Sequence, residues 1–380
     1  MPACPVPLTF LHIAKHSAQA GAFGARVGLG MSKQVKIAVI GAGVIGKCHV
    51  RSIGSVDNAR LACVVDPSPD GQSYSEGCGV DWYASITDMF RFATIDGAIL
   101  ATPSQLHVDG ALQCVANNCP VLVEKPLAID PVEAEKLVNA ARAAGVPVLT
   151  GHHRRHGAAI KKAKSLIENG VLGTVVTFEA SCWFHKHDAY FDVPWRSAPG
   201  GGPIFINLIH DINTMVHLLG DVSSVQAQSS NKVRAGEVED TAAVLLRFQS
   251  GVIGTLTVSD AVTSPWSWEL TSGENPDYPE TSQSCYRIGG TLGSLSIPDM
   301  TLWHHEGAQS WLNPIHSERI PIVREDPLIA QIRQFVAVIR GEEPPLVSGE
   351  DGLRTLRIVE AIKTSIATGQ SVGPHGTNGG

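Results

Sequence analysis

The 380-residue chain has no CxxC cysteine pair, no long apolar run and no excess of basic residues. Its eight cysteines stand at no familiar zinc spacing, so they predict buried or incidental thiols in a reducing compartment. Every apolar run ends well before the roughly 18 to 20 residues that a membrane-spanning helix needs. Because 29 basic residues face 36 acidic ones, the net charge of −7 disfavours nucleic acid and anionic membranes as partners. These absences predict a soluble, cytoplasmic protein.

The two ends of the chain differ in composition from the rest. The first 30 residues contain no acidic residue, and their short apolar patch is too interrupted for a secretory signal. We expect residues 1–34 to be an overlong start or a disordered extension, with an organelle transit peptide as the alternative. Residues 371–380, rich in glycine, are expected to form a disordered tail.

Residues 35–150 alternate short β-branched runs with helical segments, a pattern typical of a parallel sheet wrapped by helices. The expected strands cover 36–40, 60–65, 97–101 and 121–123, and an expected helix over 131–144 ends at Gly145. This α/β pattern predicts an N-terminal Rossmann domain with a doubly wound parallel sheet.

Residues 151–370 follow a different pattern. An expected helix over 158–169 precedes longer alternating runs, which predict strands over 174–183, 225–229, 241–248 and 252–258. Two amphipathic helices follow, with apolar residues at Leu328, Ile332, Phe335 and Ile339 and then at Leu353, Leu356, Val359 and Ile362. We therefore expect a second, α+β domain with an open, mostly antiparallel sheet flanked by helices.

A glycine-rich turn, GAGVIG, follows the first expected strand. Its glycines permit a tight turn, a close approach of the backbone to a pyrophosphate and close packing of the next helix on the strand. Asp66 lies 20 residues after the last of these glycines, at the end of the next strand, and this order predicts a dinucleotide site. The residues of the turn expected to contact the cofactor are Gly41, Gly43, Val44, Ile45 and Gly46.

Asp66 also bears on the choice of dinucleotide. A carboxylate here accepts hydrogen bonds from the ribose hydroxyls and repels a 2′-phosphate, and the following PSPD segment contains no arginine to receive one. NAD(H) is therefore favoured over NADP(H). The alternative is that Asp66 only caps its own loop, which would leave the preference unsupported.

Polar residues follow the third and fourth expected strands, at the sheet edge where ligands bind. The residues expected to face the cofactor are Thr102, Pro103 and His107 of TPSQLH, and Glu124 and Lys125 of VEKP. Lys125 is the first choice for chemistry, because a lysine beside a nicotinamide can hydrogen-bond a substrate hydroxyl and pass protons when burial lowers its pKa. An ordinary ion pair with Glu124, or a solvated side chain, is an equally good interpretation from composition alone.

Together, GAGVIG, TPSQLH, VEKP and the later GGGPIFINLIHDIN resemble the Gfo/Idh/MocA family of nicotinamide-dependent oxidoreductases over residues 35–370. The family takes its name from glucose-fructose oxidoreductase, inositol dehydrogenase and rhizopine catabolism. The resemblance implies a Rossmann domain and a mixed domain whose open sheet often forms a homodimer or homotetramer interface. It also implies that Lys125 contacts substrate and cofactor, that the bond between Lys125 and Pro126 is cis, and that no metal is needed.

The family histidine falls on His210, and the aspartate expected four residues earlier is replaced by Ile206. Asn207 lies close by and is a candidate substrate contact, but an amide cannot act as a base. The resemblance therefore implies that Lys125 and His210 carry the proton relay. Without the resemblance, the better interpretation of His210 is a buried histidine satisfied by a backbone carbonyl.

Two further pairs of residues match family segments. His153 and Arg154 of GHHRRH are candidate substrate contacts, and Trp195 and Arg196 match residues near the nicotinamide. Residues 264–286 have no simple family counterpart and are expected to form a structureless lid or an interface loop, with oligomer packing as the plainer interpretation. Within that segment, Trp266, Trp268 and Glu269 are suited to a polyhydroxylated ring.

The sequence thus predicts an NAD(H)-dependent enzyme that interconverts a secondary alcohol and a ketone on a cyclitol, a sugar or a carboxylated cyclic diol. Arg154 and Arg196 are the reason for including the carboxylated substrate. Two alternatives remain open. One is a tightly bound NAD that is recycled internally during sugar elimination and hydrolysis, and the other is a non-catalytic, cofactor-sensing regulator.

Overall fold

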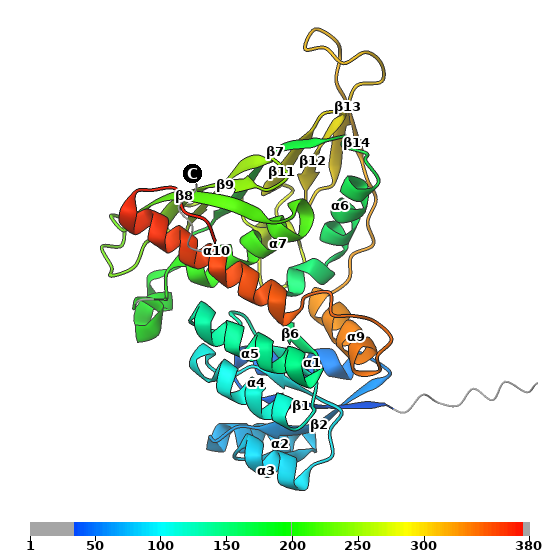
Figure 1. Ribbon diagram of the computed structural model, residues 1–380, viewed down its shortest axis with the longest axis vertical. Helices are drawn as coiled ribbons and strands as arrows, with labels where there is room; N and C mark the ends of the chain where they lie inside the picture. The colour runs from blue at the N-terminus through cyan, green and yellow to red at the C-terminus, as the bar shows by residue number, and fades with distance from the viewer. Residues whose placement is uncertain (1–33, 199, 375–380) are drawn as a thin grey trace, which may run out of the picture. The chain divides into compact units, whose positions relative to one another are not determined.

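The computed structural model describes residues 34–198 and 200–374 (Figure 1). The expected extension, up to residue 33, and the last part of the expected tail, 375–380, lie outside the described residues. Among the residues described, no helix is both long and apolar enough to cross a membrane.

A six-stranded parallel sheet forms the first half of the described chain. Its strands, in spatial order, are β3(Asp81–Tyr83), β2(Ala59–Val65), β1(Val35–Ile40), β4(Gly97–Leu100), β5(Val121–Val123) and β6(Val148–Thr150). The strand order reverses between β1 and β4, and ligands of such sheets bind at this reversal, beyond the carboxyl ends of the strands. The predicted doubly wound parallel sheet is confirmed.

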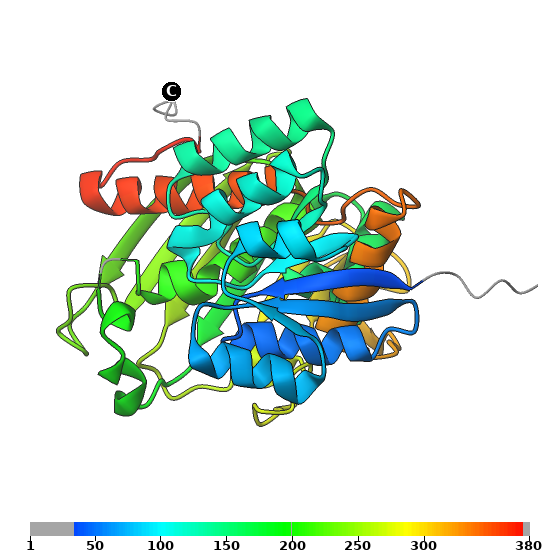
Figure 2. The ribbon, with the colours of Figure 1, turned by 90° about the horizontal axis from the view of Figure 1, so that it is seen from below.

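Helices cover both faces of this sheet (Figure 2). Alternate residues of β1 enter different apolar clusters: Ala38 and Ile40 pack beneath one set of helices, and Ile37 and Val39 beneath the other. The helices that follow the strands are α1(Val44–Gly54), α2(Pro69–Cys78), α3(Ile86–Phe92), α4(His107–Ala116) and α5(Pro131–Ala144). The expected helix over 131–144 is confirmed, because Asp130 caps its first turn and Gly145 ends it with a φ of 66°.

The second sheet is eight-stranded within the described residues. Its strands, in spatial order, are β14(His316–Arg319), β13(Thr301–His304), β12(Gly293–Ile297), β11(Tyr286–Gly290), β7(Val175–Trp183), β10(Ile253–Ser259), β9(Thr241–Phe248) and β8(Val222–Ser230). The pair β7 and β10 is parallel and the other neighbours are antiparallel, so the expected mostly antiparallel sheet is confirmed.

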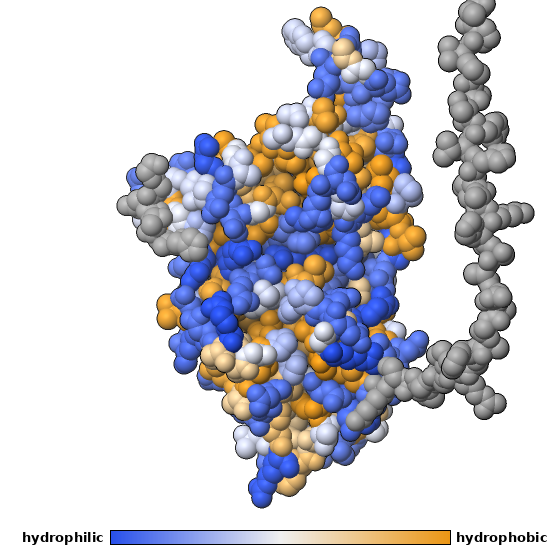
Figure 3. All heavy atoms as spheres, turned by 45° about the vertical axis from the view of Figure 1, so that its right-hand side comes forward, coloured by the Kyte–Doolittle hydropathy of each residue, from blue (hydrophilic) through white to orange (hydrophobic). Residues whose placement is uncertain are grey.

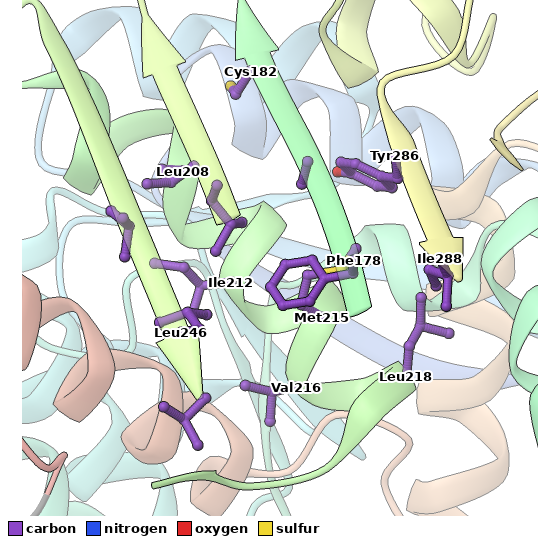
Figure 4. Packing of buried hydrophobic residues seen from close by; sticks show 14 of the residues in the cluster. Phe178, Cys182, Leu208, Ile212, Met215, Val216, Leu218, Leu246, Tyr286 and Ile288 are labelled. Carbon is purple, nitrogen blue, oxygen red and sulfur yellow. The ribbon is translucent and has the colours of Figure 1, made fainter. Parts of the chain in front are cut away.

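One face of the second sheet packs against α6(Ala158–Glu168), α7(Ile209–Leu219) and α10(Gly349–Thr368). Figure 4 shows Phe178 of β7 and Ile288 of β11 on the side of the sheet where Ile212 and Met215 of α7 lie, and all four side chains are buried. A capping box at Ser348 begins α10. The apolar core beneath this sheet holds α7 in place.

The helix α9(Pro327–Ile339) returns to the first sheet, although it lies in the range that the sequence assigns to the second domain. Its residues Ile332 and Phe335 are fully buried against Val39 of β1 and Ile53 of α1. Figures 1 and 2 both show the orange α9 beside the first sheet. The amphipathic pattern predicts an apolar face but does not say which sheet it covers.

Residues 264–286 differ from the expected structureless insertion. They contain a short helix, α8(Trp268–Thr271), and Trp268 is buried in the core of the second sheet.

The hairpin formed by β13 and β14, at one edge of the second sheet, projects at the top of Figure 1. Figure 3 shows apolar side chains gathered below this projection on one face of the molecule.

Candidate active site

The glycine-rich turn links β1 to α1 at the reversal of strand order. Gly41 has a φ of 97°, and an added Cβ there would lie 2.6 Å from the Ala101 carbonyl oxygen. Gly43 faces open space, and α1 begins after it with no side-chain cap and no acidic residue in its first turn. The amides of Val44 and Ile45 lie in this uncapped first turn, which fits an anionic pyrophosphate.

Asp66 lies beside this turn. Its carboxylate accepts hydrogen bonds from the Ala42 amide at 2.8 Å, the Ser68 amide at 2.9 Å and the Ser68 hydroxyl at 2.5 Å. Burial favours the protonated acid, but the bonds from Ser68 and Ala42 outweigh it and lower the pKa of Asp66. Asp66 therefore caps its loop, as the alternative interpretation has it, and also keeps a negative charge next to the glycine turn.

His107 connects the two polar loops that follow β4 and β5. Its Nδ1 lies 2.7 Å from the Pro126 carbonyl oxygen, and its Nε2 lies 2.9 Å from the Thr102 carbonyl oxygen. The Thr102 hydroxyl is buried at this edge without a partner among the described residues. Pro103 begins the short helical turn that leads to α4. His107 thus positions both loops rather than facing a ligand with a free ring nitrogen.

Glu124 turns into the protein, although the sequence predicts a cofactor contact for it. One carboxylate oxygen lies 2.7 Å from Nε2 of the fully buried His49 on α1, and the other accepts the Lys125 amide at 3.0 Å. Burial opposes ionisation, but the bond with His49 outweighs it and lowers the pKa of Glu124. The pair links the helix of the glycine turn to the loop that carries Lys125.

Lys125 brings the two domains into contact. Its Nζ donates a hydrogen bond of 3.1 Å to the carbonyl oxygen of Ile206 in the π-helical turn Ile204–Leu208, before α7. The Glu124 side chain pairs with His49, so Lys125 bonds the Ile206 carbonyl in place of the expected ion pair with Glu124. Burial lowers the pKa of Lys125, which suits proton transfer nearer neutral pH. The bond between Lys125 and Pro126 is cis, so that prediction is confirmed.

His210 on α7 lies with two other histidines. The centroid of its ring is 5.6 Å from that of His152 and 5.4 Å from that of His153. Burial, together with the charges of Lys125 and Arg154, lowers the pKa of His210 well below its usual range. Its Nδ1 is buried without a hydrogen-bond partner among the described residues, so no backbone carbonyl satisfies that nitrogen. A neutral imidazole in this position can accept a proton.

Arg154 faces protein carboxylates, although the sequence predicts a substrate contact for it. Its guanidinium donates to Asp211 at 2.9 Å, to Glu269 at 2.7 Å and to the Tyr286 hydroxyl at 3.1 Å. The Arg154 side chain is buried, and two carboxylates occupy its two terminal nitrogens. It therefore cannot offer a bidentate fork to a substrate carboxylate. Asp211 and Glu269 lie 57 and 115 residues away in the chain, so local pattern could not reveal this network.

Asn207 faces a lysine that the sequence did not single out. The amino group of Lys186 donates to the Asn207 side-chain oxygen at 2.9 Å and lies 3.5 Å from Asp260. Burial lowers the pKa of Lys186, and Asp260 opposes that effect. In the sequence, Lys186 lies between two histidines just after β7. Nothing in that segment distinguished the lysine as a functional residue.

A cavity of about 320 Å³ opens beside Lys125. Its lining includes Gln105 from the first domain and Trp195 and Ile206 from the second. Trp195 is 56% exposed, as a residue that covers a ligand would be. Arg196 donates from one terminal nitrogen to the Tyr190 carbonyl at 2.8 Å and lies 4.1 Å from the centroid of the Tyr190 ring, while its Nε is buried without a partner among the described residues.

Two family models match the two domains. The model described as "oxidoreductase family, NAD-binding Rossmann fold" matches residues 35–152, and the GFO/IDH/MocA C-terminal domain model matches residues 160–296. The chain belongs to the Gfo/Idh/MocA family. The family resemblance expected from the sequence is confirmed, and the first domain is the NAD-binding Rossmann domain of this family of oxidoreductases.

The relatives and solved structures described next each cover two thirds or more of the chain. A myo-inositol 2-dehydrogenase of Thermotoga maritima is 26% identical over 347 residues, which cover 89% of this chain and 98% of the relative. A 2,7-anhydro-N-acetylneuraminate hydratase of Escherichia coli is 27% identical over 269 residues, which cover 67% of this chain and 71% of the relative. A Bordetella pertussis dehydrogenase, solved with NADH and UDP-GlcNAcA, superposes with a TM-score of 0.73 at 24% identity, covering 90% of this chain and 99% of that one. At this identity the last likeness concerns the fold alone.

Proposed function

We propose that this protein is an NAD(H)-dependent dehydrogenase that interconverts a secondary alcohol and a ketone on a neutral polyhydroxylated molecule, a cyclitol or a sugar. The observation that carries the proposal is the placement of the partly buried Lys125 amino group. It lies at the carboxyl edge of the Rossmann sheet, 3.1 Å from the Ile206 carbonyl and beside the cavity that both domains line. A named myo-inositol dehydrogenase among the relatives supports the substrate class.

The cofactor would be held by the glycine turn and by Asp66. The uncapped amides at Val44 and Ile45 suit the pyrophosphate, and the Asp66 carboxylate suits ribose hydroxyls and disfavours a 2′-phosphate. Trp195 and the unpaired hydroxyl of Thr102 are placed to contact the rest of the dinucleotide. NAD(H) is therefore the proposed cofactor.

When bound, NAD⁺ would accept the hydride from the carbinol carbon of the substrate. Lys125, whose pKa burial lowers, would hydrogen-bond the reacting oxygen and take the hydroxyl proton as the carbonyl forms. His210, which burial keeps neutral and only weakly basic, would hydrogen-bond the same oxygen and complete the relay. In the reverse direction the same proton would return to the alcohol oxygen.

The internal contacts of the arginines favour a neutral substrate over a carboxylated ring. Arg154 already pairs with Asp211 and Glu269, and Arg196 is held by Tyr190. Arg154 is therefore not arranged to bind a substrate carboxylate, and the Nε of Arg196, although unpaired among the described residues, is buried. We therefore propose cyclitols and sugars before quinate-like acids or carboxylated diols.

The test is NADH formation at 340 nm with NAD or NADP across cyclitols, sugars, quinate-like acids and cyclic diols. Wild type and Lys125→Met are compared, and NADH binding is followed separately by fluorescence. We expect turnover with NAD and a cyclitol or sugar, and a loss of about 10²- to 10⁴-fold in the variant with NADH binding retained. Turnover that survives in Lys125→Met, or no turnover of any compound, would contradict the proposal.

A second candidate function has one specific observation in its favour, the hydratase among the relatives. A retained NAD that is reduced and reoxidised within one turnover would support elimination and hydrolysis of a sugar without net redox change. Such an enzyme would consume substrate while no NADH accumulates. Product analysis by NMR on the same panel separates this outcome from simple dehydrogenation.

For assembly, we propose a homodimer or homotetramer formed through the outer face of the second sheet. Leu245 and Ile253 are exposed apolar side chains on the outer face of β9 and β10, and Trp303 on β13 is 42% exposed. Exposed apolar patches of this kind often mark protein contacts. Light scattering on the purified protein gives the mass directly, and a monomer would contradict the proposal.

A further inference from the structure

The segment 264–286 places one acidic side chain, Glu269, against the site. Trp268 is stacked on Tyr286, with ring centroids 5.3 Å apart and planes at 20°, and its Nε1 donates to Glu274 at 2.7 Å. Ser267 caps α8, and the Trp183 amide at the end of β7 donates to the Trp266 carbonyl at 2.9 Å. These contacts hold the neighbouring Glu269 in a defined position.

Glu269 ends a buried chain of charges that begins next to His210. Asp211, the residue after His210, pairs with Arg154, and Arg154 pairs with Glu269 at 2.7 Å. The second oxygen of each carboxylate, Oδ2 of Asp211 and Oε2 of Glu269, is buried without a partner among the described residues. A buried acceptor without a donor is costly, so each such oxygen points to a donor that a bound molecule supplies.

Both oxygens are buried, but only one of them belongs to a side chain that reaches solvent. Asp211 is fully buried on α7, whereas the Glu269 side chain is 20% exposed. The negative charge of Glu269 also acts on Lys125 and on Lys186, and it raises the pKa of each against the effect of burial. Through Arg154, Glu269 is joined to the segment of His153, whose ring centroid lies 5.4 Å from that of His210.

Among the described residues, none that lines the cavity beside Lys125 carries a carboxylate. Ile206, where the family motif has an aspartate, lines the cavity with an apolar side chain and contributes only its carbonyl to Lys125. A polyol hydroxyl in that cavity needs an acceptor, and the Asn207 oxygen is already used by Lys186. Glu269 is not among the residues that line this cavity, but its unpaired carboxylate oxygen belongs to the charged network that adjoins His210.

We propose that Glu269 binds a hydroxyl of the substrate through Oε2, and that this carboxylate selects neutral polyols over carboxylated rings. Arg154 positions Glu269 by holding its other oxygen. The inference rests on the proposed function and extends it, since it names the group that distinguishes the substrate classes. A hydroxyl donates to the carboxylate, whereas a substrate carboxylate in the same place is repelled.

The experiment compares wild type with Glu269→Gln, and uses Glu280→Gln as the matched control. Glu280 lies in the same segment but pairs with the exposed Arg324 at the surface. NADH formation is measured with the best polyol of the panel, with each of its monodeoxy analogues and with quinate. NADH affinity and the melting temperature are measured for all three proteins.

We expect Glu269→Gln to raise the KM for the polyol by about 10- to 100-fold, the loss expected for one charge-assisted hydrogen bond, with NADH affinity unchanged. The difference from wild type should vanish for the one deoxy analogue that lacks the contacted hydroxyl. Discrimination against quinate should weaken in the same variant. Glu269→Asp, which keeps the charge, should recover part of the loss.

Equal KM effects for the polyol and every deoxy analogue would overturn the inference, because they indicate that Glu269 only holds Arg154. An unchanged KM would overturn it as well. If wild type oxidises no polyol, calorimetric titration of the NADH complex with myo-inositol and D-glucose replaces the kinetics. Binding that weakens in Glu269→Gln would then support the inference while the dehydrogenase proposal fails, and no binding would overturn both.

Discussion

The Lys125 amino group donates a hydrogen bond of 3.1 Å to the backbone carbonyl of Ile206, which is 81 residues further along the chain. Lys125 lies in the loop that follows β5 of the Rossmann sheet, and Ile206 lies in the turn that leads to α7 of the second domain. A carbonyl has no charge to stabilise an ammonium as a carboxylate would. Burial lowers the pKa of Lys125 against the opposing charges of Glu124 and Glu269, and the Ile206 carbonyl adds no further negative charge.

Replacing Ile206 by aspartate should raise the pKa of Lys125, because the new carboxylate favours the charged amine. We expect the limb of the pH–rate profile that reports Lys125 to move upward by about 1 pH unit. Ile206→Asn, which has the same shape without the charge, is the matched control. An identical shift in both variants would mean that the limb reports something other than the charge on Lys125.

Asp66→Ser should reduce the preference for NAD. The change removes the ribose acceptor and the charge that repels a 2′-phosphate, and it loosens the hold on the Ala42 amide. We expect the KM for NAD to rise by about 10- to 100-fold while the KM for NADP falls. The exposed Asp70→Ser, four residues on, is the control, and an unchanged ratio of NAD to NADP efficiency in Asp66→Ser would contradict the proposed cofactor contact.

Arg154→Met should destabilise the fold, because it leaves the buried carboxylate of Asp211 without its partner. Breaking such a pair costs about 3–5 kcal/mol in the free energy of unfolding, which urea denaturation followed by fluorescence measures. The exposed Arg287→Met, which removes a surface pair with Glu179, should cost less than about 1 kcal/mol. A stable Arg154→Met protein with only a raised substrate KM would instead identify Arg154 as a substrate contact.

Stability should fall as the pH drops below about 6.5, the ordinary pKa of an unfolded histidine. Burial lowers the pKa of His156 to about 3 and that of His153 to about 4 in the folded state. Between pH 6.5 and these values the unfolded chain binds protons that the native state does not, so acidification favours unfolding. Glu274, whose pKa burial raises to about 7, acts in the opposite direction.

A single variant isolates one histidine from these opposing effects. His156→Gln should reduce the slope of unfolding free energy against pH by about 1.4 kcal/mol per pH unit within that window, the value for one proton. Urea titrations at pH 5 and pH 6 give the slope, with His187→Gln at an exposed position as the control. Equal slopes in wild type and His156→Gln would show that His156 titrates alike in both states.

The part of the site that lies on the Rossmann domain could be predicted from the sequence. Parallel strands end at one edge of their sheet. Four neighbouring strands of the Rossmann sheet are followed at that edge by Gly41, Asp66, Thr102 and Lys125. The sequence could also place His210 by resemblance, and the structure brings it near His153. It could not show that Glu124 turns toward His49, since a residue type does not reveal which way a buried side chain points.

The sequence by itself determined the parallel sheet, the glycine turn and the family, because these depend on local periodicity and on short motifs. Only the tertiary structure decided that Arg154 faces Asp211 and Glu269, that Lys186 reaches Asn207 and that α9 covers the first sheet. These relationships join segments that are distant in the chain, and the energy of burying each charge depends on which partner the fold brings beside it. Such pairings follow from packing in three dimensions and not from the residues on either side.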